Sequence, residues 1–181
     1  MSETQVLRHS EWLRSETREE HATLEATAFN RALTEERLPL ASYVGLLKAL
    51  SVVYGVFEHA MRIVRDPCVE AVWDGSLTRA HQLEVDLDHL GRTDHPEPRR
   101  AVEAALDLGD RILRRTVEDP ASLLGHAYVL TGASLGQWSL VPTLERTFAL
   151  DVDGLRFMTG FGPDNRRRFD DFRAALDRLE L

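Results

Sequence analysis

Apolar residues recur at spacings of three and four along almost the whole chain. The segment from Tyr43 to Phe57 is the clearest case, because its apolar side chains fall on one wide helical face. No segment shows a convincing alternation of apolar and polar residues, and no Asn-Gly hairpin signal is present. The pattern therefore predicts an all-α fold.

Turn and cap residues divide this pattern into separate helices. Pro39 stands where a helix begins, Gly91 stands where a helix ends, and Pro120 interrupts the pattern again. The expected helices cover residues 4–31, 40–64, 69–73, 77–90, 122–149, 154–159 and 163–181. One further helix follows the loop at 95–98 and extends to residue 118. The chain has no internal repeat and no linker, so we expect a single domain over residues 1–181.

Composition narrows the class of protein. The 181 residues are 43% hydrophobic and 29% charged, as in an ordinary globular domain, and the net charge is −8. This acidic balance argues against a nucleic-acid partner or an anionic membrane surface. Lys48 interrupts the longest apolar run and Glu58 closes it, so we expect no membrane span. A single cysteine, Cys68, and an N-terminus without a signal-peptide pattern predict a cytoplasmic protein.

The first segment with candidate chemistry runs from residue 13 to residue 25. Leu13, Thr17, His21 and Leu24 share one helical stripe, and Glu25 lies one turn after the histidine. Glu25 can therefore hold one ring nitrogen of His21 and leave the other free to bind a metal. Arg14 and Arg18 would flank that site with positive charge, which suits a metal cofactor carrying acid groups, such as haem with its propionates.

A plainer interpretation of the same segment stays open. A single histidine on an apolar helix face is more often a satisfied core residue than a ligand. The two arginines interleave with Glu16, Glu19 and Glu20, so they can equally form weak ion pairs on a solvated face.

The second segment is rich in small residues within the expected long helix. Gly132 and Gly136 lie on one face, and each costs about 1 kcal/mol relative to alanine in a helix interior. Either a flat ligand approaches the backbone there, or two helices cross closely. Pro142 predicts a kink or an early end of the same helix.

These residues resemble the haem oxygenase family. The residues at 13, 14, 17, 21 and 25 fill every place of its proximal pattern Leu-(Arg/Lys)-x-x-Thr-x-x-x-His-x-x-x-Glu. Gly132-Ala133-Ser134-Leu135-Gly136 resembles the bacterial distal pattern Gly-Ser-x-Leu-Gly. Residues 79–90 are similar to the family's segment ending Asp-Leu-x-x-Leu, and residues 156–162 to the Phe-x-Gly-Tyr-Gly segment of phytochrome-associated members.

The resemblance implies a single-domain helical bundle that holds haem between a proximal and a kinked distal helix. Haem would be substrate and cofactor, opened with O₂ and electrons to biliverdin, CO and ferrous iron, with electrons from a separate ferredoxin, flavodoxin or reductase. His21 would bind the iron. The implied catalytic residues of the distal helix are Gly132, Gly136 and Ser134, and the implied haem-binding residues are Arg14, Thr17, Arg18, Glu25, Gln137 and Arg167.

Two departures from the family pattern keep alternatives open. Ala133 replaces an aspartate that organises water in many members, and Gln137 replaces a glycine. Gln137 either hydrogen-bonds near the distal pocket or packs between helices. One alternative function is a haem carrier without turnover. Another is a non-haem di-iron oxidase using acid–histidine pairs such as Glu58-His59 and Asp86/His89.

Overall fold

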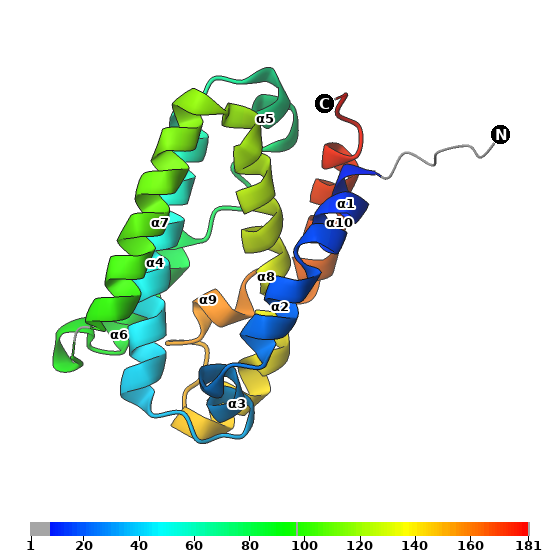
Figure 1. The fold of residues 1–181 in the computed structure, drawn as a ribbon. Helices are drawn as coiled ribbons and strands as arrows, with labels where there is room; N and C mark the ends of the chain where they lie inside the picture. Colours follow the sequence, from blue (N-terminus) through cyan, green and yellow to red (C-terminus); the bar gives the residue numbers. More distant parts are fainter. Residues whose placement is uncertain (1–7, 97, 181) are drawn as a thin grey trace.

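The computed structural model describes residues 8–96 and 98–180, and the regular structure of these residues is helical throughout (Figure 1). The α-helices are α1 (His9–Glu16), α2 (Arg18–Glu25), α3 (Ala28–Thr34), α4 (Leu40–Ile63), α5 (Pro67–Val72), α6 (Ala80–His89), α7 (Arg99–Glu118), α8 (Leu123–Phe148), α9 (Arg156–Thr159) and α10 (Asn165–Leu176). Short 3₁₀ turns lie at Arg92–Asp94, Pro120–Ser122 and Gly162–Asp164. The all-α prediction is confirmed, and from residue 40 onward most helices lie where the pattern placed them.

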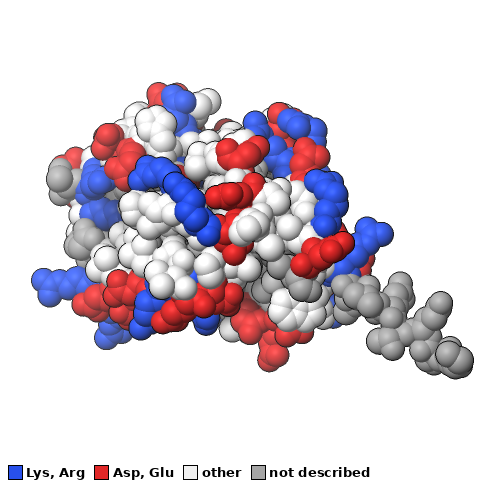
Figure 2. All heavy atoms as spheres, turned by 90° about the horizontal axis from the view of Figure 1, so that it is seen from above, with Lys and Arg blue, Asp and Glu red and all other residues white. Residues whose placement is uncertain are grey.

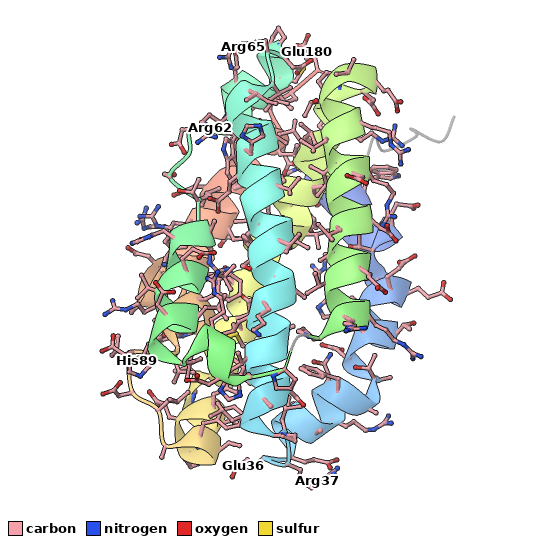
Figure 3. The ribbon with its side chains drawn as sticks, turned by 90° about the vertical axis from the view of Figure 1, so that its left-hand side faces the viewer. Glu36, Arg37, Arg62, Arg65, His89 and Glu180 are labelled. Carbon is pink, nitrogen blue, oxygen red and sulfur yellow. The ribbon has the colours of Figure 1, made fainter. Side chains whose placement is uncertain are left out.

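Helix α4 forms the centre of the domain, between α6 and α7 (Figure 3). Pro39 supplies its N-cap position, and Tyr43, Leu47 and Phe57 are almost fully buried along its length. With 24 residues, this helix is long and apolar enough to cross a membrane by length and composition alone. In the domain it is the central helix, and 44% of its most apolar window is buried.

The short helix α9 is fixed by a buried carboxylate on α6. Asp86 is fully buried and accepts hydrogen bonds from the backbone N–H groups of Arg156 (2.9 Å) and Phe157 (2.8 Å). Burial raises the pKa of this carboxyl, while the backbone hydrogen bonds oppose that shift. The aspartate of the Asp-Leu-x-x-Leu segment is therefore a structural cap that ties α6 to α9.

The N-terminal segment departs from the predicted single helix over residues 4–31. Residues 4–7 lie outside the described part, and the rest forms α1, α2 and α3. The Thr17 hydroxyl donates to the Leu13 carbonyl at 2.8 Å, and such a bond competes with helix continuation. Thr27 then caps α3 by accepting from the Asn30 N–H at 3.2 Å. The apolar periodicity of the sequence does not reveal these two side-chain hydrogen bonds, so the prediction missed both helix breaks.

Helix α8 extends without interruption through the glycine-rich segment. It continues past Pro142 to Phe148 and ends at Ala149, whose φ of 53° is left-handed. Pro142 therefore does not stop the helix. α1 and α3 both contact α8, and α10 lies along it with the start of α1 beside the end of α10 (Figure 1).

Charged residues of both signs are mixed on the surface. In the view from above (Figure 2), acidic and basic side chains alternate across the face with no large basic area. Many charges pair locally, as in Arg146–Glu36 (2.6 Å) and Arg156–Asp153 (2.7 Å). The face in that view offers no basic surface for nucleic acid.

Candidate functional site

The histidine–glutamate pair lies on a helix that has little packing of its own. No residue of α2 is buried, and the side chain of His21 is 70% exposed. Its Nδ1 lies 3.5 Å from Glu25 Oε1, an ion-pair distance that is long for a hydrogen bond. Leu24 on the same helix is 60% exposed. His21 is therefore not a core histidine, and the plainer interpretation of this residue is wrong.

An exposed helix of eight residues has little stability of its own, because helices in proteins are stabilised mainly by packing an apolar face. The apolar stripe predicted at Leu13, Thr17, His21 and Leu24 is only half-buried at its first two positions and exposed at the other two. Thr17 bonds back to its own helix through its hydroxyl. The stripe thus offers His21 and Leu24 to a ligand.

Two arginines beside this pair are available as cations. Arg14 and Arg18 are exposed, and neither has an ion-pair partner within residues 8–96 and 98–180. The alternative of ion pairs with Glu16, Glu19 and Glu20 is therefore not realised. Both cations can meet an anionic ligand at α2 without first giving up a partner.

A third cation, Arg173 on α10, was missed by the sequence interpretation. Its Nη2 lies 3.5 Å from Ser10 Oγ on α1, its Nη1 pairs with Asp170 on its own helix at 3.5 Å, and its Nε is buried without a hydrogen-bond partner among the described residues. Asp177 fixes this contact between the helices by accepting from the Ser10 N–H and hydroxyl, both at 2.8 Å. Only the packing of α1 on α10 reveals Arg173, because the two segments are more than 160 residues apart.

Arg167, the cation that the sequence favoured on this helix, is engaged elsewhere. It is exposed and pairs with Asp164 (3.2 Å) and Asp171 (3.4 Å) on its own helix surface. Arg166 lies seven residues before Arg173, so these two arginines share one side of α10. Arg173 also has an ion-pair partner, Asp170, but in addition it contacts α1 through Ser10.

The two glycines of α8 have different surroundings. A Cβ at Gly132 would lie 3.1 Å from the Phe169 ring of α10, whereas a Cβ at Gly136 would meet nothing within 4 Å. Gly132 therefore permits a close helix crossing, and Gly136 leaves backbone open to a ligand. Val129, on the same stripe seven residues before Gly136, is half-exposed.

Ser134 does not share this open side. It is buried, and its hydroxyl donates to the Thr131 carbonyl at 2.7 Å. Since Ser134 lies on the core face of α8, the catalytic role that the resemblance implied for it has no support in its position.

Gln137 reaches inward to a buried polar cluster that the sequence did not predict. Its side chain lies near the Tyr54 hydroxyl of α4, which donates to the Leu130 carbonyl at 3.0 Å. Arg79, just before α6, is only 2% exposed, and its guanidinium lies 4.2 Å from the centre of the Phe157 ring. No residue pattern in residues 79–90 signals that this arginine is buried.

Burial shifts the ionisation of this cluster. It raises the pKa of Tyr54 and lowers the pKa of Arg79, because each charged form loses hydration. It also raises the pKa of Glu58, which accepts from the backbone N–H groups of Arg79 and Ala80 at the start of α6. The cluster thus contains the Glu58 carboxylate that caps α6, the buried guanidinium of Arg79 and the buried phenol of Tyr54.

A di-iron centre does not fit the chain. Within the described residues, no group of three or more histidine, cysteine, aspartate or glutamate side chains is placed to hold a metal. Asp86 and Glu58 both serve as helix caps instead. The acid–histidine pairs noted in the sequence therefore do not converge.

Comparison with known proteins shows the family of this chain. The family model for heme oxygenase matches residues 7–181. The solved heme oxygenase of Leptospira interrogans is 26% identical, with a TM-score of 0.84, and the match covers 97% of this chain and 87% of that one. No curated protein matches the sequence significantly.

Two structures from the cyanobacterium Synechocystis sp. PCC 6803 share the fold. Its heme oxygenase-1, solved with heme, is 21% identical with a TM-score of 0.85, covering 97% of this chain and 80% of that one. Its heme oxygenase-2, solved with heme and NO, is 22% identical with a TM-score of 0.84, covering 97% and 75%. With a family match over nearly its whole length and an exposed histidine–glutamate pair at the expected positions, this chain belongs to the heme oxygenase family.

Proposed function

We propose that this protein is a haem oxygenase that opens haem with O₂ and electrons to biliverdin, CO and ferrous iron. The observation that carries the proposal is His21, an exposed histidine with a carboxylate partner on an unpacked helix, in a chain of this family. When bound, haem is both the substrate and the group that activates O₂.

His21 is the proposed iron ligand. With Glu25 Oε1 3.5 Å from Nδ1, the carboxylate favours a proton on that nitrogen and leaves the Nε2 lone pair free for iron. A neutral imidazole donates less electron density than a thiolate, and the strong donation of a thiolate favours O–O cleavage. This ligand therefore suits chemistry directed at the porphyrin.

The haem propionates are assigned to Arg14, Arg18 and Arg173. The first two are free of ion pairs within the described residues, and Arg173, although paired with Asp170 at 3.5 Å, lies beside α1 through its contact with Ser10. Arginine suits carboxylates because its planar guanidinium donates two parallel hydrogen bonds.

The open side of α8 is the proposed distal surface. Gly136 places backbone without a side chain there, so no bulky group blocks O₂. Gly132 contributes indirectly, by letting α10 and its arginines lie close to α8.

Electrons are proposed to come from a separate ferredoxin, flavodoxin or reductase, because the chain contains no Gly-x-Gly-x-x-Gly dinucleotide fingerprint. The single cysteine and the acidic composition support a cytoplasmic location without a nucleic-acid or membrane partner.

The test is an absorbance titration with hemin followed by a reductant in air. We expect a Soret band that saturates at one haem per chain and then decays into biliverdin-like red absorption. A saturating band that stays unchanged under turnover conditions would instead identify the haem carrier, which the departures at Ala133 and Gln137 favour.

The ligand assignment needs a matched pair of variants. His21→Ala should alter the spectrum of bound haem and abolish turnover. His81→Ala should change neither, because His81 is an exposed residue of α6. An unchanged haem spectrum in the His21 variant would rule out His21 as the ligand.

A further inference from the structure

The start of helix α1 is held by the C-terminal end of helix α10. Arg8 occupies the N-cap position of α1 but makes no side-chain cap hydrogen bond. Asp177 performs that function instead, because its two carboxylate oxygens accept from the Ser10 backbone N–H and from the Ser10 hydroxyl, both at 2.8 Å. The first turn of α1 is thus capped by a side chain that lies 167 residues away in the sequence.

Asp177 is placed unfavourably for its own helix. It directly follows the last residue of α10, where a helix carries partial negative charge and repels a carboxylate. At the start of α1 the partial charge is positive, and the same carboxylate is attracted. The position of Asp177 is therefore explained by α1 and not by α10.

Two further contacts join the same two segments. His9 Nε2 donates to the Leu179 carbonyl at 2.9 Å, just beyond the end of α10. Arg173, in the last turn of α10, places its Nη2 3.5 Å from Ser10 Oγ. Ser10 itself is fully buried at this contact. Several bonds thus fix the start of α1, and rotation of one side chain does not release it.

The position of α1 in turn sets the position of His21. Only Thr17 separates α1 from α2. Backbone hydrogen bonds continue through it, since the Thr17 N–H donates to the Leu13 carbonyl and the His21 N–H donates to the Thr17 carbonyl, both at 3.0 Å. Helix α2 has no buried residue, and its main helix contacts are with α1 and α3 on either side of it (Figure 1). The orientation of His21 therefore depends on how firmly α1 is held.

We propose that Asp177 is a positioning residue for the haem iron ligand: by capping α1 through Ser10, it fixes the helix that presents His21. The inference rests on the proposed function, because it takes His21 as the ligand. Asp177 acts through Ser10 and α1, and not by contact with haem. A helix that is already ordered loses less conformational freedom when a ligand binds, so the cap raises the affinity for haem.

The first test is amide hydrogen exchange in the haem-free, full-length protein. Asp177→Ala should speed exchange over residues 10–21 by about 3- to 30-fold, the range that the loss of an N-cap corresponds to. Exchange at the centre of α4 should stay the same.

The matched control is Glu58→Ala, which removes a carboxylate with a similar task elsewhere in the fold. Glu58 on α4 accepts from the backbone N–H groups of Arg79 and Ala80 at the start of α6. Glu58→Ala should speed exchange in α6 and leave residues 10–21 unchanged.

The second test is the affinity of the same variants for hemin, at a temperature where all of them are folded. Asp177→Ala should weaken binding by about 3- to 30-fold, and Glu58→Ala should leave it unchanged. Asp177→Asn keeps one oxygen that can accept from the Ser10 N–H, so it should recover part of the affinity.

A resonance Raman spectrum of the ferrous haem complex adds a readout that stability alone does not move. The iron–histidine stretching band should broaden or shift in Asp177→Ala, because a less firmly held α1 presents His21 in more than one orientation. The same band should be unchanged in Glu58→Ala.

The outcomes separate this inference from the proposed function. Equal loss of hemin affinity in Asp177→Ala and Glu58→Ala would overturn the inference, because it would show an effect of general stability. An unchanged affinity and an unchanged iron–histidine band in Asp177→Ala would also overturn it, while the haem oxygenase proposal would stand. If the unmodified protein binds haem without degrading it, the proposed function fails, and the comparison of affinities still decides the role of Asp177.

Discussion

At the scale of single residues, the site depends on pairs in which one side chain sets the chemistry of another. Glu25 faces Nδ1 of His21, and Asp177 fixes the contact between α1 and α10 beside which Arg173 lies. Exposed pairs contribute at most about 1 kcal/mol to stability. We therefore expect the exposed His21–Glu25 pair to matter for ligand binding more than for folding.

Removing the Glu25 carboxylate tests the first pair. Glu25→Ala should weaken haem binding by roughly 10- to 100-fold, because the orientation and basicity of His21 are no longer supported. Glu20→Ala, an exposed carboxylate on the same helix, is the control. Equal hemin titration curves for the two variants would contradict the role of Glu25.

Two alanine variants test whether Arg173 or Arg167 binds a haem propionate. Arg173→Ala should weaken binding of hemin because Arg173 contacts α1 through Ser10, whereas Arg167→Ala should leave it unchanged because Arg167 contacts Asp164 and Asp171 beside it on the α10 surface. Repeating the titrations with haem dimethyl ester, which lacks free carboxylates, should remove the difference. A persisting difference would assign Arg173 a packing role only.

At the scale of elements, α8 combines two glycines with opposite constraints. Gly132 faces the Phe169 ring at a distance that leaves no room for a methyl group without movement, while Gly136 faces open space. Among the residues that the structure describes, none packs against Gly136 to offset its cost. The distal surface proposed at that position would account for the cost.

Alanine substitutions separate the two glycines. Gly136→Ala should raise the free energy of unfolding of the haem-free protein by about 0.5–1 kcal/mol, since it restores helix propensity without a clash. Gly132→Ala should give a smaller gain or a loss, because its Cβ would lie 3.1 Å from Phe169. Denaturant unfolding of both variants measures the difference, and equal gains would contradict the crossing at Gly132.

At the scale of the whole molecule, the domain contains a well-packed central helix and an N-terminal helix with little packing. α4 carries much of the core with Tyr43, Leu47 and Phe57, whereas α2 has no buried residue. Regions with few buried contacts open at a lower free energy than the core. A ligand that packs on α2 should stabilise that helix first.

Hydrogen exchange with and without haem tests this division. Haem should slow amide exchange in residues 18–25 strongly and leave the already protected centre of α4 little changed. The midpoint of thermal unfolding should also rise with haem concentration, by the equivalent of about 2.7 kcal/mol at one hundred times the dissociation constant. Unchanged exchange in α2 would place haem elsewhere.

The sequence by itself determined the helices from residue 40 onward, their order and the spacing of His21 and Glu25. Helical periodicity is a local property, so α4, α7 and α8 were found close to their true ends. The proximal pattern placed His21 and Glu25 four residues apart, which is enough to bring their side chains together on any helix. The breaks at Thr17 and Thr27 were missed because single side-chain hydrogen bonds produce them.

Only the tertiary structure decided which residues meet across helices. It separated Gly132 from Gly136, moved the α10 cation from Arg167 to Arg173, and placed Ser134 in the core. It also buried Arg79 beside Tyr54 and Phe157, which lie on other helices. These contacts join segments far apart in the chain, and spacing along one helix carries no information about which neighbour its faces will meet.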